Sequence, residues 1–226
     1  EIRDFEITEY ISGKEARRYD KFLHYGVAAA MDAMQEAGLM DESHGLDPDR
    51  VGFAIGAGIG GIASIEQNTL IYEQRGARRV SPFYIPGSIV NMIGGVLSIN
   101  HGFKGPNLAV VTACTTSTHN IGLAARLIRY GDADVMVAGG AEFGTTRTAL
   151  AGFISAKAMS TRNEDPEGAS RISTTSHPRG GISKRYHAAA LVPRFMIRTS
   201  YSTSTSMSDP PCRSRSRSSL RSRWFG

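Results

Sequence analysis

The spacing of hydrophobic residues predicts short buried strands that alternate with helices. Apolar residues recur every three to five positions between Glu15 and Leu39, which predicts a helix there, and residues 1–13 are expected to form a loop. Apolar runs predict buried strands at Val51–Ile55, Leu108–Thr112 and Val135–Ala138. Further helices are expected over 62–75, Ile89–Asn100 and Thr116–Tyr130, whereas Ser81–Ser88 should be irregular and Thr145–Met159 is ambiguous. This order predicts an α/β fold with a mainly parallel sheet and helices layered around it.

The chain changes character after Arg171. Residues 171–226 are rich in Ser and hold 11 Lys or Arg against one acidic residue, Asp209, so the preceding residues are acidic overall despite a total charge of +5. We therefore divide the chain into a core portion, 1–170, and a low-complexity tail, 171–226, that is expected to be disordered. Because the excess of basic residues belongs to the tail, it does not point to a nucleic-acid partner.

Three explanations of the tail remain open. Residues 171–226 could be translated out of frame, which the abrupt loss of pattern and of acidic residues favours. They could be the disordered end of a truncated protein. They could also form an Arg-Ser segment that binds nucleic acid or is phosphorylated, which salt-dependent binding would reveal.

Composition excludes several classes of protein. Two cysteines, Cys114 and Cys212, form neither a disulfide framework nor a zinc motif, so no metal is predicted and a reducing, cytoplasmic location is expected. No apolar run reaches the roughly 18 residues of a membrane span. The chain begins Glu-Ile-Arg-Asp without a Met or a signal region, so we expect it to start inside a longer protein.

Cys114 is the strongest candidate for chemistry. It follows a predicted strand and precedes a predicted helix, a layout that places a side chain on a sharp, accessible turn. Unpaired N–H groups and the dipole at a helix start favour the nucleophilic thiolate, and Thr115, Thr116 and Ser117 could cap that start. A buried structural cysteine explains the same pattern equally well.

A resemblance separates these two interpretations. The stretches Thr112-Ala-Cys-Thr-Thr-Ser-Thr-His-Asn-Ile-Gly122 and Tyr130-Gly-Asp-Ala-Asp-Val-Met-Val-Ala-Gly-Gly-Ala-Glu142 resemble the active-site signature of the β-ketoacyl-acyl-carrier-protein synthase II enzymes. The similarity begins near the start of the chain and extends through Arg50–Gly61, Ser81–Pro86 and Ser160–Asn163 to about Arg171.

The resemblance implies a thiolase-like fold, of which this chain would hold part of the first half, and a transferase of fatty acid biosynthesis. Cys114 matches the cysteine that accepts an acyl chain from acyl carrier protein as a thioester, and its N–H would form half of an oxyanion hole. Malonyl-carrier protein would then lose carbon dioxide and attack the thioester. No cofactor is implied, and the complete enzyme would be a cytoplasmic homodimer without a membrane partner. A polyketide-type ketosynthase is the alternative within the same class.

Part of the family's machinery has no counterpart here. Two histidines, in His-Gly-Thr-Gly-Thr and Gly-His-x-x-Gly motifs, assist decarboxylation in the family, and no histidine of this chain stands in either motif. We therefore expect that the chain lacks half of the fold, folds poorly alone and does not condense malonyl-carrier protein, which leaves a binding fragment without turnover as another possibility. His119, five residues after Cys114, is expected to pack or cap rather than act as a base.

Three other features have competing interpretations. Gly56–Gly61 matches a dinucleotide fingerprint but lacks the acidic residue that should follow, so a closely packed turn is preferred. Lys14, Arg17 and Arg18 are either a solvated face or a contact for the acidic carrier protein, and their position at a helix start, against the dipole, favours the contact. Candidates for an acyl pocket or dimer contact, or for plain core, are Ile85, Ile89, Met92 and Ile93.

Overall fold

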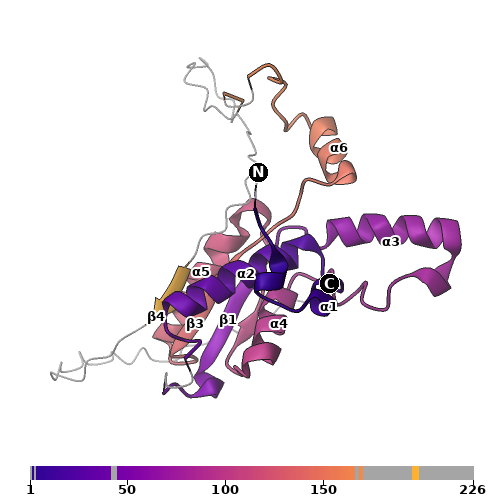
Figure 1. Cartoon of the computed structure of the whole chain (residues 1–226). Coiled ribbons are helices and arrows are strands. Elements are labelled where there is room, and N and C mark those ends of the chain that lie inside the picture. Colours follow the sequence, from indigo (N-terminus) through magenta and orange to yellow (C-terminus); the bar gives the residue numbers. More distant parts are fainter. Residues whose placement is uncertain (1, 3, 42–44, 166–167, 170–194, 199–226) are drawn as a thin grey trace, which may run out of the picture.

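The structure is a computed structural model that describes residue 2 and residues 4–41, 45–165, 168–169 and 195–198. A sheet of four strands runs through it in the order β2-β1-β3-β4. Figure 1 labels three of these strands, β1, β3 and β4. The strands are β1 (Val51–Gly56), β2 (Asn107–Leu108), β3 (Val135–Gly140) and β4 (Phe195–Arg198). β1 pairs in parallel with β2 and β3, and β4 pairs antiparallel with β3. The predicted mainly parallel sheet is therefore confirmed.

Helices cover both faces of this sheet. Because side chains alternate along a strand, Val51, Phe53 and Ile55 face one side of β1 and Ala54 faces the other. The first side packs against α2 (Lys21–Glu36) and α4 (Met92–His101), whereas Ala54 packs against α5 (Thr116–Arg129). The layered α/β arrangement predicted from the sequence is confirmed.

The predicted first helix, Glu15–Leu39, is wrong in its boundaries because the helix is interrupted at residues 17–20. Ser12 and Glu15 form a capping box that starts a short helix, α1 (Gly13–Ala16), at the end of the expected loop, and this loop also contains a 3₁₀ turn at Ile7–Glu9. Asp20 then caps α2 by accepting the N–H of Phe22 at 3.3 Å.

The other helices follow the sequence pattern more closely. Helix α3 (Ile62–Arg75) has the predicted bounds, and α4 starts three residues later than predicted. The ambiguous stretch 145–159 contains α6 (Arg147–Ser155), and short 3₁₀ turns occur at Pro48–Arg50 and Ala77–Arg79. Figure 1 shows α3 and α6 outside the layers around the sheet.

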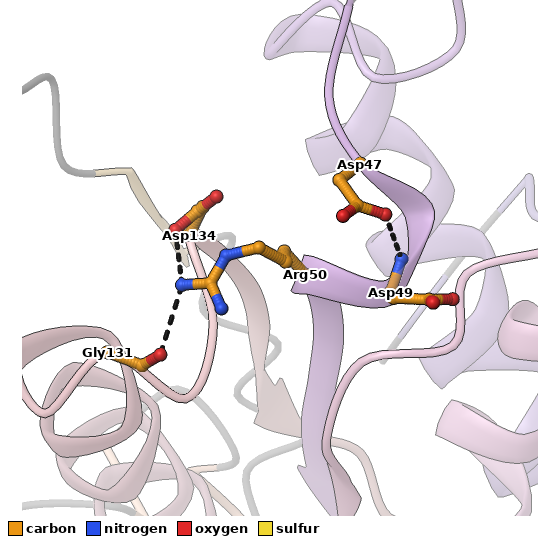
Figure 2. Close-up of polar contacts among 5 residues, drawn as sticks. All are labelled: Asp47, Asp49, Arg50, Gly131 and Asp134. Carbon is orange, nitrogen blue, oxygen red and sulfur yellow. Dashed lines mark hydrogen bonds and ion pairs between the residues drawn. The ribbon is translucent and has the colours of Figure 1, made fainter.

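Arg50 joins the starts of the two central strands (Figure 2). Its guanidinium lies 2.6 Å from the Asp134 carboxylate and donates a second hydrogen bond, at 3.0 Å, to the carbonyl of Gly131. Arg50 directly precedes β1 and Asp134 directly precedes β3. The pair therefore links the amino ends of β1 and β3, whose register is set by the parallel ladder between them.

Most of the predicted tail lies outside the described residues. Strand β4, Phe195–Arg198, is the exception, and no pattern in the sequence predicted it. In the part of the chain that the structure describes, no helix is both long enough and apolar enough to cross a membrane.

Candidate active site

Cys114 lies at the edge of the sheet where the parallel strands end. β1 and β3 are in register to their last residues, Gly56 and Gly140, so their carboxyl ends coincide. A Cβ placed on Gly140 would lie 3.4 Å from Ser117, in the first turn of α5. Ligands of open α/β folds bind at this edge of the sheet.

The thiol of Cys114 is free and exposed. Cys114 is the middle residue of a 3₁₀ turn, Ala113–Thr115, and α5 begins at the next residue. The alternative of a buried structural cysteine is thus wrong for this chain. An exposed thiol beside the unpaired N–H groups of a helix start can act as a nucleophile.

The segment before the cysteine is not the buried strand that we predicted. Only Asn107 and Leu108 pair with β1, and both are exposed at the edge of the sheet. Beyond them the backbone leaves the ladder, because the N–H and carbonyl of Val110 bond to the side chain of Asn120 instead of another strand, both at 3.0 Å.

Three side chains of α5 hold this segment. Asn120 is fully buried, and its amide also donates to the carbonyl of Thr116. The Thr116 hydroxyl accepts the N–H of Thr112 at 2.9 Å, and the Thr112 hydroxyl lies 2.7 Å from Nδ1 of His119. The residues before and after Cys114 are therefore tied to each other across the turn.

The turn contains a disfavoured backbone conformation. Ala113 has a φ of 52°, in the left-handed region that side chains with a Cβ rarely adopt. The expected capping of α5 is wrong in detail, because the N-cap residue, Thr115, makes no side-chain cap and Thr116 bonds to Thr112 instead. Fixed contacts rather than local preference therefore hold Ala113 and aim the cysteine that follows it.

His119 does not pack in the core. Its ring is exposed, and Nδ1 is engaged with Thr112. His119 therefore neither packs in the core nor caps the helix, and that prediction is wrong. Its hydrogen bond to Thr112 connects α5 to the segment before Cys114.

The glycine-rich turn after β1 is closely packed, as the preferred interpretation required. A Cβ on Gly56 would lie 2.7 Å from the carbonyl of Val110. The N–H groups of Ile59 and Gly60 donate to the carboxylate of Glu142, at 2.5 and 3.2 Å. The donors that a dinucleotide phosphate would use are engaged by the protein's own carboxylate.

Two of the three basic candidates do not lie at a helix start. Because α1 ends at Ala16, Arg17 and Arg18 follow a helix rather than start one, so the argument from an unfavourable dipole is wrong for these two, whereas Lys14 is the second residue of α1. Lys14 and Arg17 are exposed. The guanidinium of Arg18 stacks over the ring of Phe83 at 4.4 Å, which links this basic group to the irregular stretch 81–88.

The four pocket candidates separate in the structure. Ile93 of α4 is fully buried and packs directly against Gly26 of α2, so it belongs to the core. Met92 is half-buried against the same core. Ile85 and Ile89 are 60% and 42% exposed and remain candidates for a contact surface.

Sequence reasoning missed Asn120 and Glu142. Asn120 stands in line with Thr116, Ala124 and Ile128 at intervals of four residues, so a polar residue in the buried stripe of α5 was the available signal. Glu142 follows the end of a buried strand, at the edge where β1 also ends. Within the described residues, no group of three His, Cys, Asp or Glu could hold a metal ion.

Comparison with known proteins identifies the family to which this chain belongs. The family model described as "Beta-ketoacyl synthase, N-terminal domain" matches residues 5–180. The chain belongs to the β-ketoacyl synthase family. Its relatives include the 3-oxoacyl-[acyl-carrier-protein] synthase 2 of Vibrio harveyi, 53% identical over 170 residues, and that of Coxiella burnetii, 46% identical over 171. These matches cover 75% and 76% of this chain but 40% and 41% of the relatives.

Solved structures agree with the family. A type II polyketide ketosynthase, solved in complex with its acyl-carrier protein, has a TM-score of 0.64 and 27% identity over 70% of this chain and 46% of its own. A β-ketoacyl synthase from Burkholderia phymatum has a TM-score of 0.63 and 25% identity over 73% of this chain and 40% of its own. The thiolase-like fold expected from the resemblance is confirmed as a partial one, and the chain spans about 40% of the length of the curated relatives it matches.

Proposed function

We propose that Cys114 is the acyl-accepting nucleophile of a 3-oxoacyl-[acyl-carrier-protein] synthase of fatty acid biosynthesis. The observation that carries the proposal is an exposed thiol on a turn directly before α5, at the carboxyl edge of a parallel sheet, in a chain of this family. The Cys114 thiolate attacks the carbonyl of an acyl-carrier thioester. The carrier's carbon–sulfur bond breaks, the carrier leaves as a thiol, and the acyl group stays on the cysteine sulfur.

The oxyanion of this transfer needs hydrogen-bond donors, and the N–H of Cys114 is one candidate donor. In the second half of the synthase reaction, a malonyl-carrier thioester loses carbon dioxide and its carbanion attacks the Cys114 thioester. A β-ketoacyl-carrier product then leaves and the thiolate is regenerated. The decarboxylating histidines implied by the resemblance have no match in this chain. We therefore assign to these residues the first half-reaction, acyl transfer to Cys114.

Acyl carrier protein is the proposed partner. One structural relative is a ketosynthase solved with its acyl-carrier protein, which supports a partner of this class. Exposed Lys14 and Arg17, with Arg18 stacked beside the 81–88 stretch, offer positive charge to an acidic carrier. Ile85, Ile89 and Met92 are proposed to contact the acyl chain or a second copy of the protein.

A homodimer and a cytoplasmic location are also proposed. Strand β2 is an edge of the sheet, and Leu108 in this strand and Val111 beyond it are exposed apolar residues, which suits pairing with a second copy. The free thiol of Cys114 suits a reducing compartment. A polyketide-type ketosynthase is a second candidate, favoured by the structural similarity to such an enzyme, and it would use Cys114 in the same way.

The test is to incubate the 226-residue chain with acyl-carrier thioesters and to locate acylation by mass spectrometry of the intact chain and of its peptides. We expect the mass of one acyl group on the peptide that holds Cys114, and none after Cys114→Ala. Acylation that persists in Cys114→Ala, or none in the wild-type chain while iodoacetamide modifies Cys114, would contradict the proposal. A chain that binds carrier protein without being acylated would point to the alternative of a binding fragment.

A further inference from the structure

Glu142 places a carboxylate against the backbone of the glycine-rich turn. It stands two residues beyond the end of β3, and the turn follows the end of β1, so the parallel pairing of the two strands brings them together. Oε2 accepts the N–H of Ile59 at 2.5 Å, and Oε1 accepts the N–H of Gly60 at 3.2 Å. The backbone N–H groups of Gly58 and Phe143 also stabilise the carboxylate. Successive N–H groups that converge in this way form an anion-binding concavity, which here is filled from within the protein.

The carboxylate is not at an ordinary surface position. Partial burial raises the pKa of the Glu142 carboxyl, and the four backbone N–H groups act in the opposite direction. Burying an acid is unfavourable unless it is hydrogen-bonded. The hydrogen bonds that Glu142 accepts immobilise the turn at Gly58–Gly60.

The immobilised turn lies directly against the cysteine turn. A Cβ built on Gly58 would be 3.1 Å from Oε2 of Glu142 and 3.2 Å from Cα of Ala113, so Gly58 separates the carboxylate from Ala113 with no room to spare. Ala113 has the left-handed backbone described above and is joined to Cys114. A disfavoured conformation persists where its surroundings leave it no alternative, and the Gly58 backbone is one side of those surroundings.

We propose that Glu142 is a positioning residue for Cys114: its carboxylate fixes the Gly58–Gly60 turn, which packs against Ala113 and thereby sets the direction of the Cys114 thiol. This inference rests on the proposed role of Cys114 as acyl acceptor. It predicts that loss of the carboxylate impairs acyl transfer, which needs a defined approach to the carbonyl. Reaction with a small alkylating reagent, which needs only an accessible thiol, should change little.

The test uses the 226-residue chain with Cys212→Ser, so that Cys114 is its one thiol. Glu142→Ala removes the carboxylate and Glu142→Gln keeps its size. Glu66→Gln is the matched control, because Glu66 also accepts a backbone N–H, from Thr148 at 3.0 Å, but ties α3 to α6 instead of bordering Ala113. Each variant is measured for its rate of acylation by an acyl-pantetheine thioester, its rate of alkylation by iodoacetamide, and the ¹³C and ¹⁵N chemical shifts of Ala113, which report the sign of its φ.

We expect Glu142→Ala to lose about tenfold in acylation rate while alkylation stays within about twofold, with Ala113 leaving its positive φ. Glu142→Gln, which retains one acceptor oxygen, should fall between the wild type and Glu142→Ala, and Glu66→Gln should match the wild type. Unchanged Ala113 shifts in both Glu142 variants would overturn the proposal. A wild-type chain that is never acylated, but whose Ala113 shifts still respond to Glu142→Ala, would overturn the proposed function and leave the positioning by Glu142 standing.

Discussion

Asn120 pairs with the backbone of Val110 as a residue of a neighbouring strand would. Its Oδ1 accepts the N–H of Val110 and its Nδ2 donates to the carbonyl, both at 3.0 Å. A single buried amide thus replaces one step of the β ladder. The approach to Cys114 is in consequence held by a helix, and a change in α5 is transmitted directly to the nucleophile turn.

We expect Asn120→Ala to lower the free energy of unfolding by roughly 1 to 3 kcal/mol, because it removes a buried side chain and leaves the part-buried backbone groups of Val110 without their partner. It should also change the rate at which iodoacetamide modifies Cys114. The measurements are urea unfolding and alkylation kinetics below the unfolding transition.

Asn68→Ala is the control for Asn120→Ala. Asn68 is also buried, donates to the carbonyl of Ser64 at 2.8 Å and accepts the N–H of Ser81 at 3.1 Å. It should reduce stability comparably and leave Cys114 alkylation unchanged. Equal effects of both variants on alkylation would refute a specific role of Asn120 at the turn.

Glu142 should make stability depend on pH in an unusual direction. Burial raises the pKa of its carboxyl above 4.5, so the folded chain keeps this proton to a higher pH than the unfolded chain does. Its contribution to stability is present below pH 4.5 and is lost as pH rises through the folded-state pKa. We therefore expect the free energy of unfolding of the wild type, relative to Glu142→Gln, to fall as pH rises above 4.5.

Glu66 provides the opposite case for the same series of urea titrations. Hydrogen bonds from Thr146 and Thr148 lower the pKa of its carboxyl, so its contribution is present above pH 4.5 and is lost as pH falls through the folded-state pKa. Comparison with Glu66→Gln should show this reversed slope. Parallel pH profiles for the wild type and Glu142→Gln would contradict the raised pKa of Glu142.

Two glycines should respond to alanine in opposite directions. A Cβ on Gly56 would lie 2.7 Å from the Val110 carbonyl and 3.0 Å from Nδ2 of Asn120, so Gly56→Ala should destabilise by about 1 to 3 kcal/mol. Gly122, inside α5, has no atom within 4 Å of such a Cβ. Gly122→Ala should stabilise by about 0.5 to 1 kcal/mol, because alanine favours the helix.

Thermal unfolding of both glycine variants beside the wild type tests this pair. A melting temperature that rises in Gly56→Ala would show that α5 can move away from the sheet. One that falls in Gly122→Ala would show a contact on that face of α5 that the structure lacks.

The ion pair of Arg50 and Asp134 should contribute little. Both side chains are well exposed, so a double-mutant cycle with Arg50→Ala and Asp134→Ala is expected to give a coupling of about 0.2 to 1 kcal/mol that shrinks in high salt. A coupling above 2 kcal/mol that is insensitive to salt would contradict this.

The sequence predicted those elements whose burial follows a regular period. Val51–Ile55 and Val135–Ala138 were recognised because continuous apolar runs are buried on both faces of a sheet, and α5 because its apolar positions repeat every three to four residues. Leu108–Thr112 is a similar apolar run, but its backbone conformation depends on Asn120, ten residues beyond Val110, and no local pattern predicts that contact.

The site, too, was predicted only in part. The position of Cys114 before a helix follows from the order of local elements, so it could be read from the chain. Glu142 could not, because it meets the glycine turn only after β1 and β3 have paired across 83 residues of sequence. Strand β4 likewise depends on pairing with β3, and its four residues are too short a pattern to predict a strand.

The face of the central strands that packs against α5 includes two alanines, Ala54 and Ala138. Val51, Phe53, Ile55, Val135 and Val137 face α2 and α4, whereas Ala54, Met136 and Ala138 face α5, which contributes Ala124 to the contact. Small side chains let a helix approach a sheet closely. Asn120 of this helix bonds to the backbone of Val110. A larger residue at Ala54 or Ala138 would push α5 away from the sheet and displace Cys114, which precedes this helix. The position of the nucleophile therefore depends on buried alanines, and substitutions at these positions would change the site without changing any residue on its surface.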